Sequence, residues 1–194
     1  EDLSDFDSGI IGMDKIIGSI KKAKIDDNIK GIKLKSGSIG SGWAQAREIR
    51  NTLEDFKTSG KFIYSYSDNM SQKGYYVSSV ADSIFMNPIG MMQLKGLSSE
   101  VLYYEDFQNQ YGVKMEVIRH GKYKSAVEPY LQDHMSDENR IQIQSLLDAV
   151  WETFRNEVSQ SRGITSASMD KLANELVVND AEEALANGII DGLV

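Results

Sequence analysis

The sequence predicts an α/β protein in which short buried strands alternate with amphipathic helices. Short runs rich in β-branched and aromatic residues recur between stretches whose apolar residues have helical spacing. Clusters of glycine, serine and proline separate the two kinds of segment. Regular alternation of strand and helix is typical of parallel strands joined by right-handed crossovers, so we expect most strands to be parallel.

The first third of the chain contains two predicted helices on either side of a strand. Apolar residues recur at helical spacing over residues 10–20, ahead of a basic cluster at residues 21–24 that suits the last turn of a helix. A strand over residues 31–35 and a glycine-rich turn over residues 37–42 follow, and then a helix over residues 44–58.

The next segment repeats this order. A strand is predicted over residues 62–66, and Ser71 is placed as the N-cap of a helix that reaches about residue 80. A short strand over residues 84–86 then stops before Pro88, which cannot donate a hydrogen bond to a sheet.

The last predicted elements are a helix over residues 99–110, a strand over residues 114–118 and a long helix over residues 137–161. A chain of 194 residues has an ordinary length for one domain, so we expect a single domain over residues 1–194.

Bulk composition excludes several classes of function. The chain is 41% hydrophobic and 26% charged, as soluble globular proteins are, and its net charge of -8 argues against binding to nucleic acid. The absence of cysteine excludes disulfides, thiolate nucleophiles and cysteine-based zinc sites. The longest uncharged stretch, residues 83–94, is shorter than the roughly 20 apolar residues that span a bilayer.

The chain begins without a methionine or a signal peptide, so we expect an excised, soluble piece of a longer protein whose anchor lies elsewhere. Its two histidines, His120 and His134, lack the spacing and the partner residues of a metal site. We therefore expect neither a metal nor another cofactor.

Residues 121–129, which read Gly-Lys-Tyr-Lys-Ser-Ala-Val-Glu-Pro, most constrain the function. They set Lys124 in a mostly uncharged segment. A lysine ordinarily has a pKa of about 10.4, but burial beside apolar groups disfavours the ammonium and can leave a neutral amine. A neutral amine can deprotonate a serine hydroxyl. The alternative is that Lys124 is a solvated surface cation.

This segment resembles the signal peptide peptidase A family, and so do residues 69–79, which read Asn-Met-Ser-Gln-Lys-Gly-Tyr-Tyr-Val-Ser-Ser. The resemblance runs in order from about Gly31 to Val194. More narrowly, the chain is similar to the N-terminal half of the long, two-repeat form of that enzyme, protease IV. The resemblance implies a ClpP/crotonase-like fold, a superhelix of βαβ units with mostly parallel strands, and a Ser-Lys pair in place of a catalytic triad.

The resemblance also implies roles for particular residues. The family places its base directly after an aromatic residue, which makes Lys124 the expected general base and Lys122 the weaker candidate. Ser125 and Glu128 are possible lysine-orienting groups. A turn hydroxyl and an exposed carboxylate before Pro129 would be equally ordinary.

The nucleophile is missing from the expected position. Catalytic copies of the repeat read Ala-Ser-Gly-Gly-Tyr-Tyr at a helix start, whereas residues 71–76 read Ser-Gln-Lys-Gly-Tyr-Tyr, so Gln72 occupies the serine position. Ser71 lies one residue earlier, about 100° away around a helix, and is better explained as a cap. In the family, the turn that corresponds to residues 37–42 can supply backbone N–H groups for an oxyanion hole. The Pro-Gly-Gly usual in catalytic copies is absent here, which leaves a plain flexible turn as the alternative.

The implied function is that of the base-donating half of a membrane-associated serine endopeptidase that degrades cleaved signal peptides. This half alone would be inactive, because the serine is expected in a C-terminal repeat. The implied location is the periplasmic side of the bacterial inner membrane. The implied partners are that repeat, peptide substrates and further copies in a homo-oligomer, by expectation a tetramer. A non-catalytic assembly scaffold and a crotonase-type acyl-CoA enzyme remain alternatives.

Overall fold

The computed structural model describes residues 11–118 and 124–194, which form two compact units. The first unit runs to Lys95 and resumes over Phe154–Val194, and the second is Gly96–Thr153. The first unit contains a four-stranded sheet in which neighbouring strands follow chain order and every pair is parallel. Its strands are β1 (Gly31–Leu34), β2 (Phe62–Ser67), β3 (Ser83–Met86) and β4 (Gly192–Leu193). The predicted α/β class with parallel strands is confirmed.

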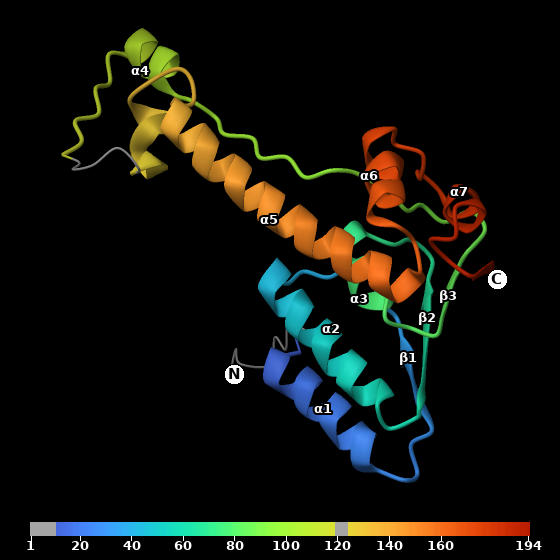
Figure 1. Ribbon diagram of the computed structural model, residues 1–194. Helices are drawn as coiled ribbons and strands as arrows, with labels where there is room; N and C mark the ends of the chain where they lie inside the picture. Colours follow the sequence, from blue (N-terminus) through green and yellow to red (C-terminus); the bar gives the residue numbers. More distant parts are fainter. Residues whose placement is uncertain (1–10, 119–123) are drawn as a thin grey trace, which may run out of the picture. The chain divides into compact units, whose positions relative to one another are not determined.

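Among the described residues of the first unit, five whole helices accompany this sheet: α1 (Met13–Ile25), α2 (Trp43–Lys57), α3 (Gln72–Ser78), α6 (Ser166–Asn174) and α7 (Ala181–Ala186). The end of α5 (Asp137–Arg162), from Phe154 onward, also belongs to this unit. Helices α1 and α2 lie side by side (Figure 1). Alternate residues of β2 are buried, beginning with Ile63, as expected when helices cover one face of a sheet. Leu53 and Phe56 of α2 are fully buried and form part of the core.

The other face of the sheet carries aromatic side chains. Phe62 and Tyr64 of β2 are about half exposed, and their ring centroids lie 4.9 Å apart. The Phe62 ring covers Gly31 of the neighbouring strand so closely that a Cβ at that glycine would lie 2.4 Å from the ring. Glycine at position 31 therefore makes room for the ring.

The same carboxylate clamp occurs twice in the sheet. Asp82, directly before β3, accepts a hydrogen bond from Ile63 N–H of β2 at 2.8 Å. Asp191, directly before β4, accepts one from Ile84 N–H of β3, also at 2.8 Å. Each carboxylate also pairs with a cation from a helix, Lys57 for Asp82 and Arg162 for Asp191. The same local contact therefore joins β2 to the start of β3 and β3 to the start of β4.

The clamp at Asp191 predicts a specific response to acid. Burial disfavours the ionised carboxylate, but the hydrogen bonds from Arg162 and Ile84 outweigh it and lower the pKa of Asp191 below 3.8. A lowered native pKa stabilises the fold fully above the unfolded-state pKa, and the contribution is lost as pH falls through the native pKa. Asp191→Asn should therefore lower the free energy of unfolding at pH 7 by about 1 kcal/mol and lose less stability between pH 5 and pH 2.

Urea unfolding across this pH range measures both effects. Asp27→Asn is the matched control, because Asp27 is exposed. An Asp191→Asn protein with the same acid profile as the unsubstituted chain would contradict the prediction.

The second unit contains α4 (Glu105–Tyr111), the 3-10 helix η2 (Ser125–Tyr130) and the part of α5 (Asp137–Arg162) that ends at Thr153. The predicted long helix is confirmed, and the helix expected from residue 99 begins only at Glu105. Tyr104 N–H donates to Pro129 O at 2.7 Å, which holds this residue outside the helix, and Glu105 and Asp106 supply the acidic first turn.

The strand predicted over residues 114–118 is wrong, because these residues form no ladder with any described part of the chain. No helix within residues 11–118 and 124–194 is both long and apolar enough to cross a bilayer. The expectation of a single domain over residues 1–194 stays a prediction.

Candidate active site

The first turn of α3 is the part of the first unit that corresponds to the expected nucleophile. Ser71 is its N-cap, since Ser71 Oγ accepts a hydrogen bond from Gly74 N–H at 3.0 Å. Ser71 N–H donates to Gly37 O at 2.7 Å, which joins the helix start to the loop after β1. The predicted capping role of Ser71 is confirmed.

Gln72, the first residue of α3, has a structural contact. Its Oε1 accepts a hydrogen bond from Lys95 N–H at 3.0 Å, so the side chain secures the segment that follows β3. A primary amide has no hydroxyl or thiol with which to attack a carbonyl carbon. An anchoring group therefore stands at the position that the resemblance assigns to the catalytic serine.

Gly74 explains how closely this helix approaches the loop after β1. A Cβ on Gly74 would lie 2.1 Å from Ser36 O and 2.7 Å from Gly37 O, inside the contact distance of any real Cβ. Lys73 reaches the same loop from the other side and donates a hydrogen bond to Ser41 O. The close contact between α3 and this loop depends on glycine at position 74.

A hollow of about 560 Å³ opens beside this contact, at the carboxyl ends of β1 and β2. Ligand sites of parallel α/β sheets usually form at this edge. Most of the residues that line it are polar, and their hydrogen bonds include one from Ser67 Oγ to Asn69 O and one from Met91 N–H to Asn69 Oδ1 at 2.8 Å. Its residues are Lys35, Gly37, Ser38, Ser67, Asp68, Asn69, Met70, Ser71 and Met91.

The glycine-rich turn at residues 37–42 has structural contacts as well. Gly37 O accepts the hydrogen bond from Ser71, and Gly42 begins α2 with its N–H donated to Gln45 Oε1 at 3.1 Å. Its suggested part in an oxyanion hole stays a prediction. Within the described residues no three His, Asp or Glu side chains gather as metal ligands do.

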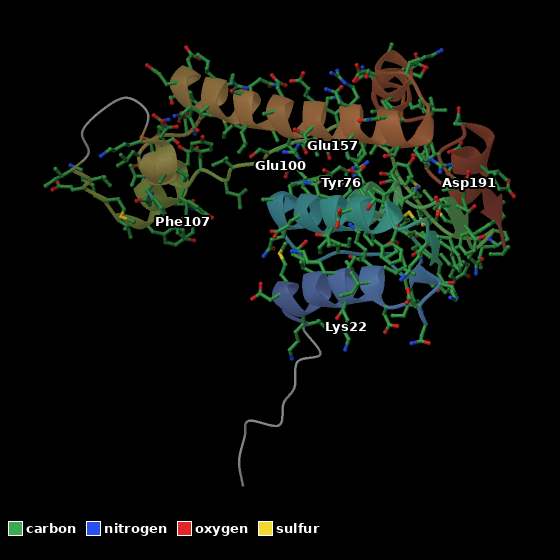
Figure 2. All side chains as sticks on the ribbon, turned by 60° about the horizontal axis from the view of Figure 1, so that its bottom comes forward. Lys22, Tyr76, Glu100, Phe107, Glu157 and Asp191 are labelled. Carbon is green, nitrogen blue, oxygen red and sulfur yellow. The ribbon has the colours of Figure 1, made fainter. Side chains whose placement is uncertain are left out.

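A buried ionic cluster behind α3 was missed by the sequence analysis. Arg50 is 1% exposed, donates to Glu157 O at 3.0 Å and to Ser161 Oγ at 2.5 Å, and pairs with Glu54 at 2.6 Å. Tyr76 donates its hydroxyl to Glu157, and the two side chains point toward one another in Figure 2. Burial and this hydrogen bond raise the pKa of Tyr76. The cluster joins α2, α3 and the last turns of α5.

The lysine segment lies in the second unit. Lys124 is exposed and directly precedes η2, whose first residue is the partly buried Ser125. Glu128 follows one turn later and is only 1% exposed, so the alternative of an exposed carboxylate is wrong. His120, Lys122 and Tyr123 lie outside the described residues.

Two residues at the start of α5 hold the Glu128 carboxylate. Ser136 Oγ donates to Glu128 Oε1 at 2.6 Å, and Asn139 Nδ2 donates to Oε2 at 3.0 Å. Ser136 Oγ also accepts from Asn139 N–H at 3.2 Å, as an N-cap does. The turn that carries Lys124 is thus anchored to a helix start. A serine three residues before an asparagine, ahead of a long helical pattern, was the available sequence signal.

The structure brings Lys124, Ser125 and Glu128 together in one turn, whereas Gln72 belongs to the other unit. The model of peptidase family S49 matches residues 55–194, a range that includes both α3 and the lysine turn. The chain belongs to peptidase family S49.

Relatives of this S49 chain carry protease names. Protease 4 of Haemophilus influenzae is 36% identical over 150 residues, which cover 77% of this chain and 24% of the relative. Protease 4 of Salmonella typhi is 32% identical over 186 residues, which cover 92% and 30%. A chloroplastic serine protease SPPA of Arabidopsis thaliana is 29% identical over 172 residues, which cover 89% and 25%.

The S49 chain therefore spans about a quarter to three tenths of the length of these relatives. Membership of family S49 confirms the resemblance to signal peptide peptidase A and, with the parallel sheet, the expected ClpP/crotonase-like fold.

Proposed function

We propose that this chain is the base-donating half of a serine peptidase, with Lys124 as the general base and the nucleophilic serine supplied by a C-terminal repeat. The observation that supports this proposal most directly is the lack of a nucleophile in the first turn of α3. Gln72 stands at the nucleophile position and binds Lys95 N–H, while Ser71 caps the helix. A chain of family S49 with no nucleophile at this position can take part in peptide cleavage only if another repeat supplies the serine, which supports the proposal.

The proposed reaction needs only one amine. Neutral Lys124 removes the serine proton as the oxygen attacks the scissile carbonyl, and the resulting ammonium returns a proton to the departing amine of the peptide. Lys124 is exposed ahead of a short, anchored turn, so its amine can reach a group outside its own unit. The apolar surroundings that favour a neutral amine would then come from the C-terminal repeat.

The wider proposal follows the resemblance. The substrates are cleaved signal peptides, the whole protein lies at the inner membrane of a bacterium with this unit on the periplasmic side, and several copies assemble with their C-terminal repeats. Membership of family S49 favours a peptidase over an acyl-CoA enzyme.

Complementation tests the proposal. This chain alone should not cleave an apolar signal-peptide substrate, and adding the C-terminal half of the same protein should produce cleavage that a serine-directed fluorophosphonate abolishes. Cleavage by the C-terminal half alone at the same rate would overturn the proposal and favour the scaffold role.

We also propose that Glu128 positions the lysine turn through Ser136 and Asn139. Glu128→Gln keeps the size of the side chain but sets an amide against two donors, and it should lower kcat of the complemented enzyme about tenfold with little change in KM. The same substitution should lower the free energy of unfolding by about 1 to 3 kcal/mol. Steady-state kinetics and urea unfolding measure the two effects.

Glu100→Gln is the control for Glu128→Gln, since Glu100 is exposed in the same unit. An unchanged kcat together with lost stability would leave Glu128 a purely structural residue.

A further inference from the structure

The segment at residues 113–117 has the sequence of a strand but no partner strand in the described part of the chain. It reads Val-Lys-Met-Glu-Val, with apolar residues at alternate positions. Val113 N–H donates to Gln108 O at 2.9 Å, and residues 114–118 make no backbone hydrogen bond to another described residue. Figure 1 draws this segment as extended chain beyond α4.

Unpaired backbone groups along an extended segment are a template for pairing with another strand. Gly112 has a φ of 69° and ends α4 in the left-handed region, so an extended segment can begin at Val113. Val113 and Met115 are 54% and 44% exposed, although both are residues that sheets normally bury. Five residues make a strand of ordinary length.

We propose that this segment, residues 113–117, pairs antiparallel with the same segment of a second copy of the chain, about a twofold axis at Met115. In this register Lys114 lies opposite Glu116 of the other copy, and Glu116 lies opposite its Lys114. Val113 likewise meets Val117, and Met115 meets itself. A twofold interface is self-complementary in this way, so both ion pairs form together.

The charges of Lys114 and Glu116 favour this register over the two registers whose axis is shifted by one residue. An axis one residue later, at Glu116, sets the two Glu116 carboxylates opposite each other, and an axis at Lys114 does the same with the two amines. Like charges directly opposite destabilise a strand pair, whereas opposite charges stabilise it. Within one chain Lys114 Nζ lies 3.6 Å from Glu116 Oε1, consistent with a shared side of the segment, and both side chains are more than 80% exposed.

The rest of the second unit also exposes large apolar side chains, as surfaces that bind another protein chain do. Among the described residues of this unit, Gly96–Thr153, six large apolar side chains outside residues 113–117 are each at least 60% exposed, which is an unusual concentration for so small a unit. They are Leu102, Phe107, Tyr111, Ile118, Ile141 and Leu146.

A hollow of about 460 Å³ lies directly beside Val113 and Met115, between α4 and Tyr130. Two strands alone are only marginally stable, so apolar contacts of this kind are needed to support the pair.

Single cysteines test the register, because the chain has no cysteine of its own. Symmetric pairing brings the two Met115 Cα atoms to about 4.5 to 5.5 Å, within disulfide range. The two Val113 Cα atoms are then about 14 Å apart, beyond that range. Under diamide, Met115→Cys should give a linked dimer at least tenfold faster than Val113→Cys. An equimolar mixture of Val113→Cys and Val117→Cys should link as heterodimers.

Charge reversal tests the ion pairs. Glu116→Lys and Lys114→Glu should each weaken self-association on the order of tenfold in sedimentation equilibrium, and mixing the two variants should restore it because every opposed pair is again of opposite sign. Glu100→Lys is the matched control for Glu116→Lys, with the same change of net charge on an exposed residue of this unit, and should leave association unchanged.

These readouts do not involve peptide cleavage, so the pairing stands or fails independently of the proposed function. A chain that stays monomeric at every concentration would overturn it. Association without faster linking of Met115→Cys would overturn it as well, because another surface would then hold the copies together.

Discussion

Lys124→Ala should lower kcat of the complemented enzyme on the order of 10²- to 10⁴-fold, the range expected for loss of a general base. The variant should fold normally, because the Lys124 side chain is exposed and precedes the 3-10 helix without forming part of it. Peptide cleavage after mixing with the C-terminal half measures the loss, and urea unfolding measures the stability of the variant.

Lys124→Arg separates proton transfer from simple charge. Arginine keeps the positive charge but does not lose its proton at working pH, so it cannot act as a base. If Lys124 removes a proton, Lys124→Arg should be as inactive as Lys124→Ala. Lys171→Ala, at an exposed position of α6, is the control. Activity retained in Lys124→Arg would show that only the cation matters.

Gly74→Ala should lower stability strongly for a change of a single methyl group. The added Cβ would meet Ser36 O at 2.1 Å and Gly37 O at 2.7 Å, and both are backbone atoms that cannot rotate away. Separating α3 from the loop after β1 would also weaken the hydrogen bond from Ser71 N–H to Gly37 O. We expect a loss of about 3 kcal/mol in the free energy of unfolding.

Gly40→Ala is the matched control, because a Cβ at Gly40 meets nothing within 4 Å in the loop after β1. It should change stability by only a few tenths of a kcal/mol or stabilise slightly through the unfolded chain. Equal stabilities for the two variants, measured by urea unfolding, would mean that α3 can shift away from the loop without cost.

Elements with a strong local pattern were predictable from the sequence. Strands β1, β2 and β3 and helices α2 and α5 begin and end within two residues of the predicted bounds, because periodic apolar residues and nearby glycine or proline define them locally. The strand prediction for residues 114–118 was wrong because a strand depends on a partner strand and not on its local pattern alone. A strand exists only when another strand supplies its hydrogen bonds, and the described chain supplies none there.

The candidate site likewise has features that the sequence predicts and features that it does not. The cap at Ser71 follows from residue type and position, and the absence of a nucleophile at Gln72 could be read from the sequence alone. The partners of the buried charged residues could not be predicted from the sequence. Arg50 meets Glu157 across more than a hundred residues of sequence, and Glu128 meets Ser136 and Asn139 only because the chain turns back onto the start of α5.

The two carboxylate clamps at Asp82 and Asp191 bear on how this fold tolerates insertion. Between β2 and β3 the chain makes a short excursion, whereas between β3 and β4 it makes one long enough to hold the entire second unit, yet Asp191 meets Ile84 just as Asp82 meets Ile63. A contact made by the residue directly before each new strand thus fixes the register of that strand, whatever length of polypeptide precedes it. The register of β4 therefore does not depend on the length or fold of the segment that precedes it.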